Sequence, residues 1–446
     1  MSLFDALTVA VEALSWIEVE GLNERQAFLR SSNQLDVRDS QTLKLSHLLV
    51  LESIRRQNLL DKILAIADPS LTYQRLNAGP RNFARIYAYW TKVRGASWEE
   101  SLALLKAGRK ALGWKELAPL EVIFGRLLGA RLEDAFASAS ETETIALKTF
   151  HPSWLVEYCT RIFGRTKGMK ILAGNTRPPP IYVRVNTLVE DESTIVEKIN
   201  RMGTRLKKVQ GMKHVYTVIR SNDPLSGSRI ARSGEIQIQD KSSCMTVLAA
   251  KPKPGETVFD VCSAPGAKTS FIAQLMRNRG KIFSLDISKS RMSFWKKEME
   301  RMKVKAACPI ISDARQSFPL NIEADLIVLD PPCSNSGTFG KTPSGKWGTR
   351  PSDFRRFSKI QLQMLHRCGE RVRIGGRLVY STCSISMEEN EQVIEAFLKL
   401  DPRFRLTEIE PQLGEPGMRG LDQTTRLYGH VDSCNGYFLA AMIRDT

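Results

Sequence analysis

The sequence of 446 residues predicts an α/β protein with a Rossmann-like, doubly wound sheet, preceded by a small α+β module and an all-α N-terminal domain. Three observations predict this fold class. The first 150 residues show helical periodicity, the composition changes at residue 151, and short apolar strands alternate with amphipathic helices from about residue 255. We expect domains at residues 1–147, 148–254 and 255–446.

The first 150 residues are typical of a helical bundle. Ala, Leu, Glu and Arg recur, Gly and Pro are sparse, and chain breaks fall at Asp68-Pro69, Gly79-Pro80 and Gly113. An apolar stripe at helical spacing is formed by Leu43, Leu45, Leu48, Leu49, Ile54, Leu59, Leu60, Ile63 and Leu64. We expect this domain to join the next one within residues 142–148.

The stretch from residue 151 to about 250 mixes short helices and strands. His151-Pro152-Ser153-Trp154-Leu155 opens a helix, and residues 177–180 (Arg-Pro-Pro-Pro) predict a stiff extended segment. Strand candidates follow at residues 181–185, 215–219 and 235–238. The pattern predicts a small α+β module.

The formal net charge of +17 is unevenly distributed. Residues 1–150 hold 19 Lys and Arg against 18 Asp and Glu, whereas residues 151–256 hold 18 against 9 and residues 257–446 hold 28 against 21. The basic excess after residue 150 indicates a polyanionic partner, of which nucleic acid is the commonest.

From about residue 255 the alternation of strands and helices is regular. Strands are expected at residues 257–261, 281–285, 309–311, 326–329 and 377–380, and helices at 269–276, 291–302, 358–372 and 388–400. This order predicts a parallel, doubly wound sheet. Ligands of such sheets bind outside the carboxyl ends of the strands, where each motif described below falls.

The turn after the first of these strands predicts a cofactor site. It reads Cys262-Ser263-Ala264-Pro265-Gly266-Ala267-Lys268, and its small residues let the backbone approach a ligand at the start of a helix. Gly266 stands alone, so the dinucleotide fingerprint is absent. Asp286, at the end of the next strand, is placed to accept hydrogen bonds from ribose hydroxyls, and Asp313 to contact an adenine amino group. Together they predict a nucleoside pocket.

Two cysteines are expected at strand ends on the same side of the sheet. One follows Asp330-Pro331-Pro332 as Cys333, and the other is Cys383 in Ser381-Thr382-Cys383. A thiolate that adds to cytosine C6 turns C5 into a nucleophile, and a second thiol can handle a proton during release. Asp330 can bond the N3/N4 edge of the base. Residue order alone leaves open which cysteine attacks.

The chain resembles the RsmB/NOP family of RNA 5-methylcytosine methyltransferases over roughly residues 148–446. The blocks that carry the resemblance are His151–Leu155, Arg184-Val185-Asn186-Thr187, Gln239-Asp240-Lys241-Ser242-Ser243, Cys262–Thr269, Asp330–Ser334, Tyr380–Ser384, Glu388-Glu389-Asn390-Glu391 and Asn435-Gly436-Tyr437-Phe438. Residues 37–39, the leucine stripe and Arg55-Arg56 resemble the NusB-like domain of the bacterial rRNA enzyme, although the near-neutral charge of this part argues against strong unspecific phosphate binding.

The resemblance implies a methyltransferase sheet, S-adenosylmethionine as the cofactor and RNA as the substrate, with rRNA favoured over tRNA. It implies that Cys383 is the nucleophile and that Cys333 assists release. It places the loop from Cys262 to Lys268, Asp286, Arg291, Asp313 and Asp330 around the cofactor, and makes residues 148–254 an RNA-binding extension. The chain departs from the family where Gly is usual, at Ala267 and at Asn335-Ser336.

The cysteine spacing, the N-terminus and the hydropathy argue against a metal-binding, secreted or membrane-spanning protein. The eight cysteines are scattered without zinc-ligand spacing, so no metal is expected. The N-terminus lacks the pattern of a signal peptide, and no run of 18 apolar residues is present. We expect a soluble, cytoplasmic and monomeric protein with reduced thiols.

Three alternatives remain. A DNA cytosine methyltransferase places its attacking cysteine in the Pro-Cys motif and lacks the Thr-Cys motif that contains Cys383. An amino-group methyltransferase typically has an aromatic residue after Asp-Pro-Pro, where this chain has Cys333. An RNA-binding assembly factor could keep the fold without catalysis, but Cys333, Cys383, Asp286 and Asp330 are all present.

Overall fold

The computed structural model describes residues 2–70, 72–316 and 318–446, which form two compact units. The first unit comprises Met1–Thr176 and Thr342–Thr349, and the second comprises Arg177–Lys341 and Arg350–Thr446. The expected division near residue 147 falls inside the first unit and stays a prediction.

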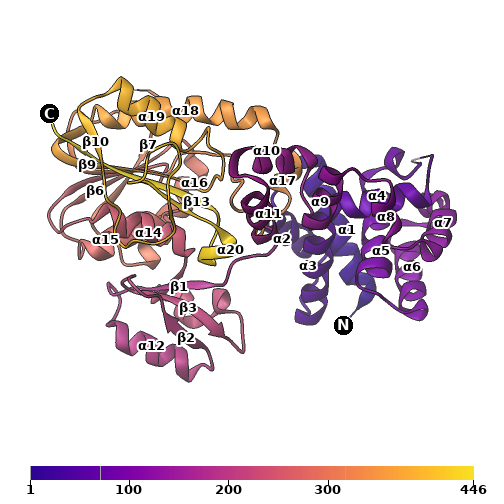
Figure 1. The fold of residues 1–446 in the computed structure, drawn as a ribbon. Helices are drawn as coiled ribbons and strands as arrows, with labels where there is room; N and C mark the ends of the chain where they lie inside the picture. Colours follow the sequence, from indigo (N-terminus) through magenta and orange to yellow (C-terminus); the bar gives the residue numbers. More distant parts are fainter. Residues whose placement is uncertain (1, 71, 317) are drawn as a thin grey trace. The chain divides into compact units, whose positions relative to one another are not determined.

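The first unit is helical, as predicted (Figure 1). Its elements are α1 (Leu3–Glu20), α2 (Glu24–Gln34), α3 (Ser40–Arg55), α4 (Gln57–Ala67), η1 (Thr72–Arg75), α5 (Ala78–Ala88), η2 (Tyr89–Val93), α6 (Trp98–Leu112), α7 (Trp114–Gly129), α8 (Asp134–Ala137), α9 (Glu141–Thr149), α10 (Ser153–Phe163), α11 (Arg165–Gly174) and α17 (Gly345–Gly348). Ser97 and Glu100 form a capping box at α6, which satisfies backbone donors at that terminus. The apolar faces of α1 to α9 meet in one core that includes Phe83, Tyr87 and Phe124.

A short segment from the C-terminal half of the sequence completes this helical core. The indole nitrogen of Trp347 donates to the Ile54 carbonyl at 2.6 Å, and Nζ of the fully buried Lys346 donates to the Arg55 carbonyl at 2.8 Å. Burial, together with the positive charges of Arg55 and Arg56, holds the pKa of Lys346 well below its ordinary value. Sequence periodicity gave no signal for this insertion.

The second unit contains the expected α+β module from Arg177 onward, whereas α10 and α11, which the prediction placed in the same module, fall in the first unit. Four antiparallel strands lie in the order β2-β3-β1-β4, with bounds β1 (Tyr182–Val185), β2 (Arg205–Lys208), β3 (Val215–Arg220) and β4 (Ile236–Ile238). Helix α12 (Glu192–Arg201), η3 (Leu225–Gly227) and α13 (Arg229–Arg232) accompany them. Val183, Val185, Ile195 and Ile199 share its small core.

The large sheet has the order β11-β12-β13-β9-β8-β5-β6-β7, and β10 pairs with β13. Its strands are β5 (Thr257–Val261), β6 (Lys281–Asp286), β7 (Ala307–Ile311), β8 (Ala324–Leu329), β9 (Val372–Thr382), β10 (Phe404–Thr407), β11 (Glu415–Pro416), β12 (Thr425–Leu427) and β13 (Tyr437–Arg444). The five predicted strands are parallel, which confirms the core of the prediction. The expectation of a wholly parallel sheet is wrong, because β10 to β13 pair antiparallel at one edge.

Helices cover both faces of this sheet (Figure 1). They are α14 (Lys241–Ala250), α15 (Ala267–Leu275), α16 (Lys289–Arg301), α18 (Pro351–Gly369) and α19 (Glu391–Leu400), with α20 (Gly429–Asp432) before β13. Val258 packs in the core with α14 and α15, whereas its neighbour Phe259 packs in the core with α18 and α19. Successive residues of a strand point to opposite faces, so the doubly wound arrangement follows from apolar strands buried on both sides.

Candidate functional site

A cavity of about 610 Å³ lies at the carboxyl ends of the parallel strands. It is lined by Cys262, Ala264, Leu285, Asp286, Ile287, Arg291, Ser312, Asp313, Ala314, Arg315, Asp330, Pro331, Pro332, Cys333, Asn335, Phe357, Ile360, Met364 and Cys383. The volume is in the range of small-molecule sites. The structure therefore brings the three predicted aspartates and both predicted cysteines to one cleft.

The turn between β5 and α15 forms one wall of the cleft. Gly266 has φ of 109°, and a Cβ there would lie 2.5 Å from the Met299 methyl carbon and 3.0 Å from the Trp295 ring. Only glycine fits this close approach and this conformation. Ala267 begins α15 and is not among the residues with positive φ, so its methyl group is tolerated. Of the seven residues predicted in this turn, Cys262 and Ala264 line the cavity, whereas Ser263, Pro265, Gly266, Ala267 and Lys268 do not.

Asp286 ends β6 and is almost fully buried. Its carboxylate accepts hydrogen bonds from the backbone amides of Ala264 at 3.3 Å and Ser288 at 3.0 Å. Nη2 of Arg291 lies 3.4 Å from Oδ2 of Asp286 and donates to the Ala264 carbonyl. This arrangement fixes an acidic group at the cleft beside the cofactor turn.

Asp313 lies beyond the end of β7 and is paired with Arg315, a residue that the sequence gave no reason to single out. Arg315 Nη2 and Asp313 Oδ2 are 2.6 Å apart. The hydrogen bond from Arg315 holds the pKa of Asp313 below its ordinary value. Asp313 is thus an oriented, ionised acceptor at the cleft wall.

Asp330, after β8, is held from two sides. Nζ of Lys268 donates to Oδ2, and the Ser381 hydroxyl donates to Oδ1 at 3.2 Å. Burial disfavours the charged form of Lys268 and lowers its pKa. The adjacent Asp330 carboxylate and other acidic groups have the larger opposite effect, so the pKa of Lys268 is raised. The Tyr437 phenol donates to Ser381 at 3.0 Å, which ties the C-terminal motif to this chain of contacts.

The two thiols lie side by side at the cleft. Sγ of Cys333 and Sγ of Cys383 are 3.3 Å apart, and both cysteines are free. The hydrogen bond with Cys383, followed by burial, raises the pKa of Cys333 well above its ordinary value. Cys383 is the more accessible of the pair, and its thiol donates to Oδ1 of Asn335 at 2.9 Å. Asn335 has φ of 56°, a conformation that asparagine tolerates better than most residues.

A buried carboxylate ties the two cysteine loops together. Glu389 is fully buried, and its Oε1 accepts from the hydroxyls of Ser334, Ser384 and Ser386 at 2.5, 2.6 and 2.9 Å. Its Oε2 accepts from the Ser334 amide at 2.9 Å and from Gln361 Nε2 at 3.0 Å. Ser334 and Ser384 each follow one of the cysteines, so Glu389 fixes the separation of the thiols.

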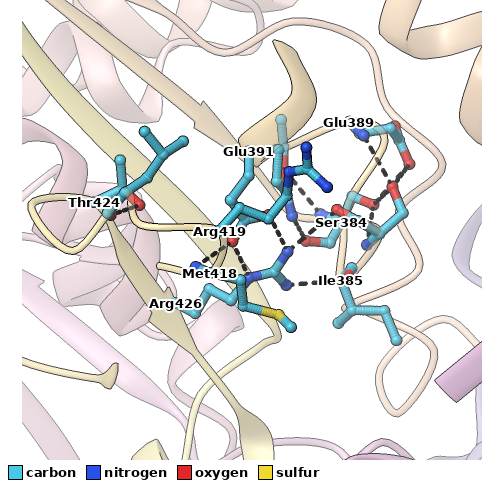
Figure 2. Close-up of polar contacts among 12 residues, drawn as sticks. Ser384, Ile385, Glu389, Glu391, Met418, Arg419, Thr424 and Arg426 are labelled. Atoms are coloured by element: carbon cyan, nitrogen blue, oxygen red, sulfur yellow. Dashed lines mark hydrogen bonds and ion pairs between the residues drawn. The ribbon is translucent and has the colours of Figure 1, made fainter. Parts of the chain in front are cut away.

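The loop after Cys383 is held by a second buried group (Figure 2). Nε of Arg426 donates to Oε1 of Glu391 at 2.6 Å, and both side chains are almost completely buried. Nη1 of Arg426 also donates to the Ile385 carbonyl at 3.0 Å. The resemblance included Glu389 and Glu391 without giving them a role, and the sequence carried no signal for Arg426.

The backbone of the C-terminal Asn-Gly motif is in direct contact with the backbone of the Cys333 loop. The Gly337 amide donates to the Cys383 carbonyl at 2.9 Å, and the Gly436 amide donates to the Gly337 carbonyl at 2.8 Å. A Cβ on Gly337 would lie 2.0 Å from the Gly436 carbonyl oxygen. Three loops that are distant in the sequence are therefore locked together around the thiols.

In residues 2–70, 72–316 and 318–446, no three His, Cys, Asp or Glu side chains gather as a metal ion would require. Within the same residues, no helix has the length and hydropathy needed to cross a membrane.

Two family models match most of the chain after residue 150. Residues 246–443 match the family model for the 16S rRNA methyltransferase RsmB/F, and residues 151–220 match the RsmF/B-like ferredoxin-like domain. A probable ribosomal RNA small subunit methyltransferase B from Bacillus subtilis is 32% identical over 304 residues, 67% of each chain. The 25S rRNA (cytosine-C(5))-methyltransferase nop2 from Schizosaccharomyces pombe is 30% identical over 65% of this chain, which spans only 50% of that relative.

Solved structures extend the similarity. The crystal structure of the protein PH0851 aligns with 100% of this chain and 99% of its own, with a TM-score of 0.84 and 27% identity. A methyltransferase homologue from Pyrococcus horikoshii aligns with 69% of this chain and 99% of its own, with a TM-score of 0.62 and 29% identity. With the Bacillus relative and both family models, these matches show that the chain belongs to the RsmB/NOP family of methyltransferases.

Proposed function

We propose that this protein uses S-adenosylmethionine to form 5-methylcytosine in ribosomal RNA, with Cys383 as the nucleophile. The observation that carries the proposal is the pair of free thiols 3.3 Å apart at a cleft that also holds three strand-end aspartates. Relatives named as rRNA (cytosine-C5) methyltransferases support the substrate class.

The residues of the cleft fit the proposed cofactor. Asp286 offers a carboxylate for the ribose hydroxyls, and Asp313 offers an acceptor for the adenine amino group. Cys262 and Ala264 of the turn after β5 line the same wall of the cavity. Leu285, Ile287 and Phe357 line the same cavity and offer apolar surface for the adenine ring. S-adenosylmethionine, when bound, supplies the methyl group.

The thiols divide the chemistry between them. Cys383 loses its proton to solvent in the cleft, and its Sγ then forms a bond to C6 of the cytosine. That bond moves the electron pair of the C5–C6 double bond to C5 and makes that carbon nucleophilic. After C5 is methylated, a base takes the C5 proton, the double bond re-forms and the bond between C6 and Sγ breaks. The departing Cys383 thiolate takes a proton from solvent, and the Cys333 thiol, 3.3 Å away, can stabilise that thiolate by donating a hydrogen bond to it.

The substrate must present an accessible base. Attack on C6 cannot occur within a stacked duplex, so the target is an unpaired or flipped cytidine. The excess of Lys and Arg over residues 151–256 supports RNA binding by the ferredoxin-like module. We also propose that residues 1–147 form a NusB-like domain and that the protein acts as a cytoplasmic monomer.

A denaturing gel tests the assignment of the thiols. Wild type, Cys333→Ala and Cys383→Ala are mixed with labelled RNA and S-adenosylmethionine. A covalent band that accumulates with Cys333→Ala and is lost with Cys383→Ala supports attack by Cys383 and release by Cys333. A band retained by Cys383→Ala and lost with Cys333→Ala reverses the roles. No band and no tritium transferred from labelled cofactor to ribosomal RNA, in a protein that still retards that RNA on a native gel, identifies an RNA binder without catalysis.

A further inference from the structure

Helix α18 carries an exposed basic surface that the catalytic chemistry does not use. Arg355, Arg356 and Lys359 are exposed and line a shallow hollow together with Ser352 and Ile360. We call these five residues the α18 ridge. Arg356 is paired with Asp353 at 2.8 Å. Among the residues that the structure describes, Arg355 and Lys359 have no carboxylate within ion-pair distance.

The α18 ridge adjoins the catalytic cleft. Ile360 lines both the hollow and the cleft, and Phe357 and Met364 of the same helix also line the cleft. One helix therefore presents an apolar wall to the cleft and a cationic surface beside it. If a cytosine is bound at the two thiols, the sugar-phosphate backbone of the neighbouring nucleotides would lie at the edge of the cleft that α18 forms.

We propose that the α18 ridge binds backbone phosphates of single-stranded RNA next to the target cytidine, with Arg355 and Lys359 as the contacting cations. The proposal rests on the proposed RNA methyltransferase function. A base drawn out of its stack needs the neighbouring strand to be held, because unstacking costs a few kcal/mol. Two cations without carboxylate partners suit this task, since phosphate contacts release counterions without breaking an internal ion pair.

Salt-dependent binding tests the ridge. The double variant Arg355→Ala/Lys359→Ala is compared with wild type by fluorescence anisotropy of a labelled single-stranded ribosomal RNA fragment. We expect roughly tenfold weaker binding at 0.1 M salt, and a plot of log affinity against log salt that is less steep by about 1.4, about 0.7 for each lost phosphate contact. The matched control is Lys296→Ala/Lys297→Ala, which removes the same charge from the exposed face of α16.

The outcomes separate the two proposals. If the salt dependence of RNA affinity is unchanged in the ridge variant, or if the control variant loses as much RNA affinity, the ridge assignment is overturned even if wild type methylates RNA. Wild type that binds S-adenosylmethionine but neither binds nor methylates RNA overturns the proposed function and the ridge together. Both variants should bind S-adenosylmethionine and melt like wild type, because all four substituted side chains are exposed.

Discussion

The carboxylate of Glu389 accepts a hydrogen bond from the Ser384 hydroxyl at 2.6 Å, directly beside the nucleophile proposed here. The same oxygen accepts from Ser334, which follows the other cysteine. One buried acidic side chain thus holds the backbone after both thiols. The distance between the two thiols therefore depends on the hydrogen bonds to Glu389 as well as on the strands that carry the cysteines.

Glu389→Gln should loosen the cysteine loops. An NH₂ group at the Oε2 position would face the Ser334 amide and the Gln361 amide, which can only donate. An NH₂ group at the Oε1 position could make at most two hydrogen bonds to hydroxyl oxygens, where Oε1 now accepts three. Leaving buried donors unsatisfied costs about 1–3 kcal/mol. We expect a lower melting temperature and slower methyl transfer with unchanged S-adenosylmethionine affinity, measured by thermal unfolding, tritium transfer and calorimetry. Glu408→Gln, on the exposed surface, should change none of these.

The buried Arg426–Glu391 pair (Figure 2) should contribute far more to stability than the Arg419–Glu395 pair. Arg426→Met leaves the Glu391 carboxylate buried and unpaired, at a cost of about 3–5 kcal/mol. Arg419 is 47% exposed, so Arg419→Met should cost less than about 1 kcal/mol. Urea unfolding measures the free energy of unfolding of both single variants and of the double variant Arg426→Met/Glu391→Gln, which should recover part of the loss. A double variant no more stable than Arg426→Met would contradict it.

The parallel core of the fold and the meeting of motifs at its edge could be predicted from the sequence. Apolar strands separated by amphipathic helices permit few topologies, and parallel strands bring their carboxyl ends to one edge. This reasoning placed Asp286, Asp330, Cys333 and Cys383 together before any distance was known. Strand periodicity does not encode direction, so the antiparallel pairing of β13 with β9 was missed.

The contacts that fix the site geometry could not be predicted. Arg426 reaches Glu391 across 35 positions, and Lys346 is buried among residues of α3 that lie 291 positions away. Such pairs depend on tertiary packing, and neither residue type nor local spacing distinguishes a buried arginine or lysine from a solvated one. Arg315 was missed for the same reason, although it orients Asp313.

The two thiols should differ in reactivity. The hydrogen bond with Cys383 and burial raise the pKa of Cys333, so little thiolate forms there at pH 8, whereas Cys383 is more accessible. Iodoacetamide labelling followed by peptide mass mapping should modify Cys383 well before Cys333. Buried Cys159, whose thiol pKa burial raises to about 12, serves as the slow reference within the chain. Equal rates at Cys333 and Cys383 would contradict the difference in burial and pKa.

Asp260 should make stability fall as the pH rises from about 4 to 7. The side chain is fully buried, Thr269 donates to its Oδ2 at 2.5 Å, and its Oδ1 has no hydrogen-bond partner among the described residues. Burial raises its pKa to about 7, so the folded protein binds a proton that the unfolded chain releases near pH 4. The stabilisation that this retained proton adds to the free energy of unfolding is fully present below about pH 4 and is lost by about pH 7. It amounts to about 4 kcal/mol at most.

Asp260→Asn isolates that contribution. The amide oxygen can still accept from Thr269, and no proton is gained or released, so the variant should lack this part of the pH dependence. Because charging the buried carboxylate destabilises only wild type, the variant should gain in relative stability from pH 4 to pH 8. Thermal unfolding of both proteins across this range measures the difference. A constant difference between their melting temperatures would mean that Asp260 is ionised throughout, with its charge satisfied by the Lys268 ammonium nearby.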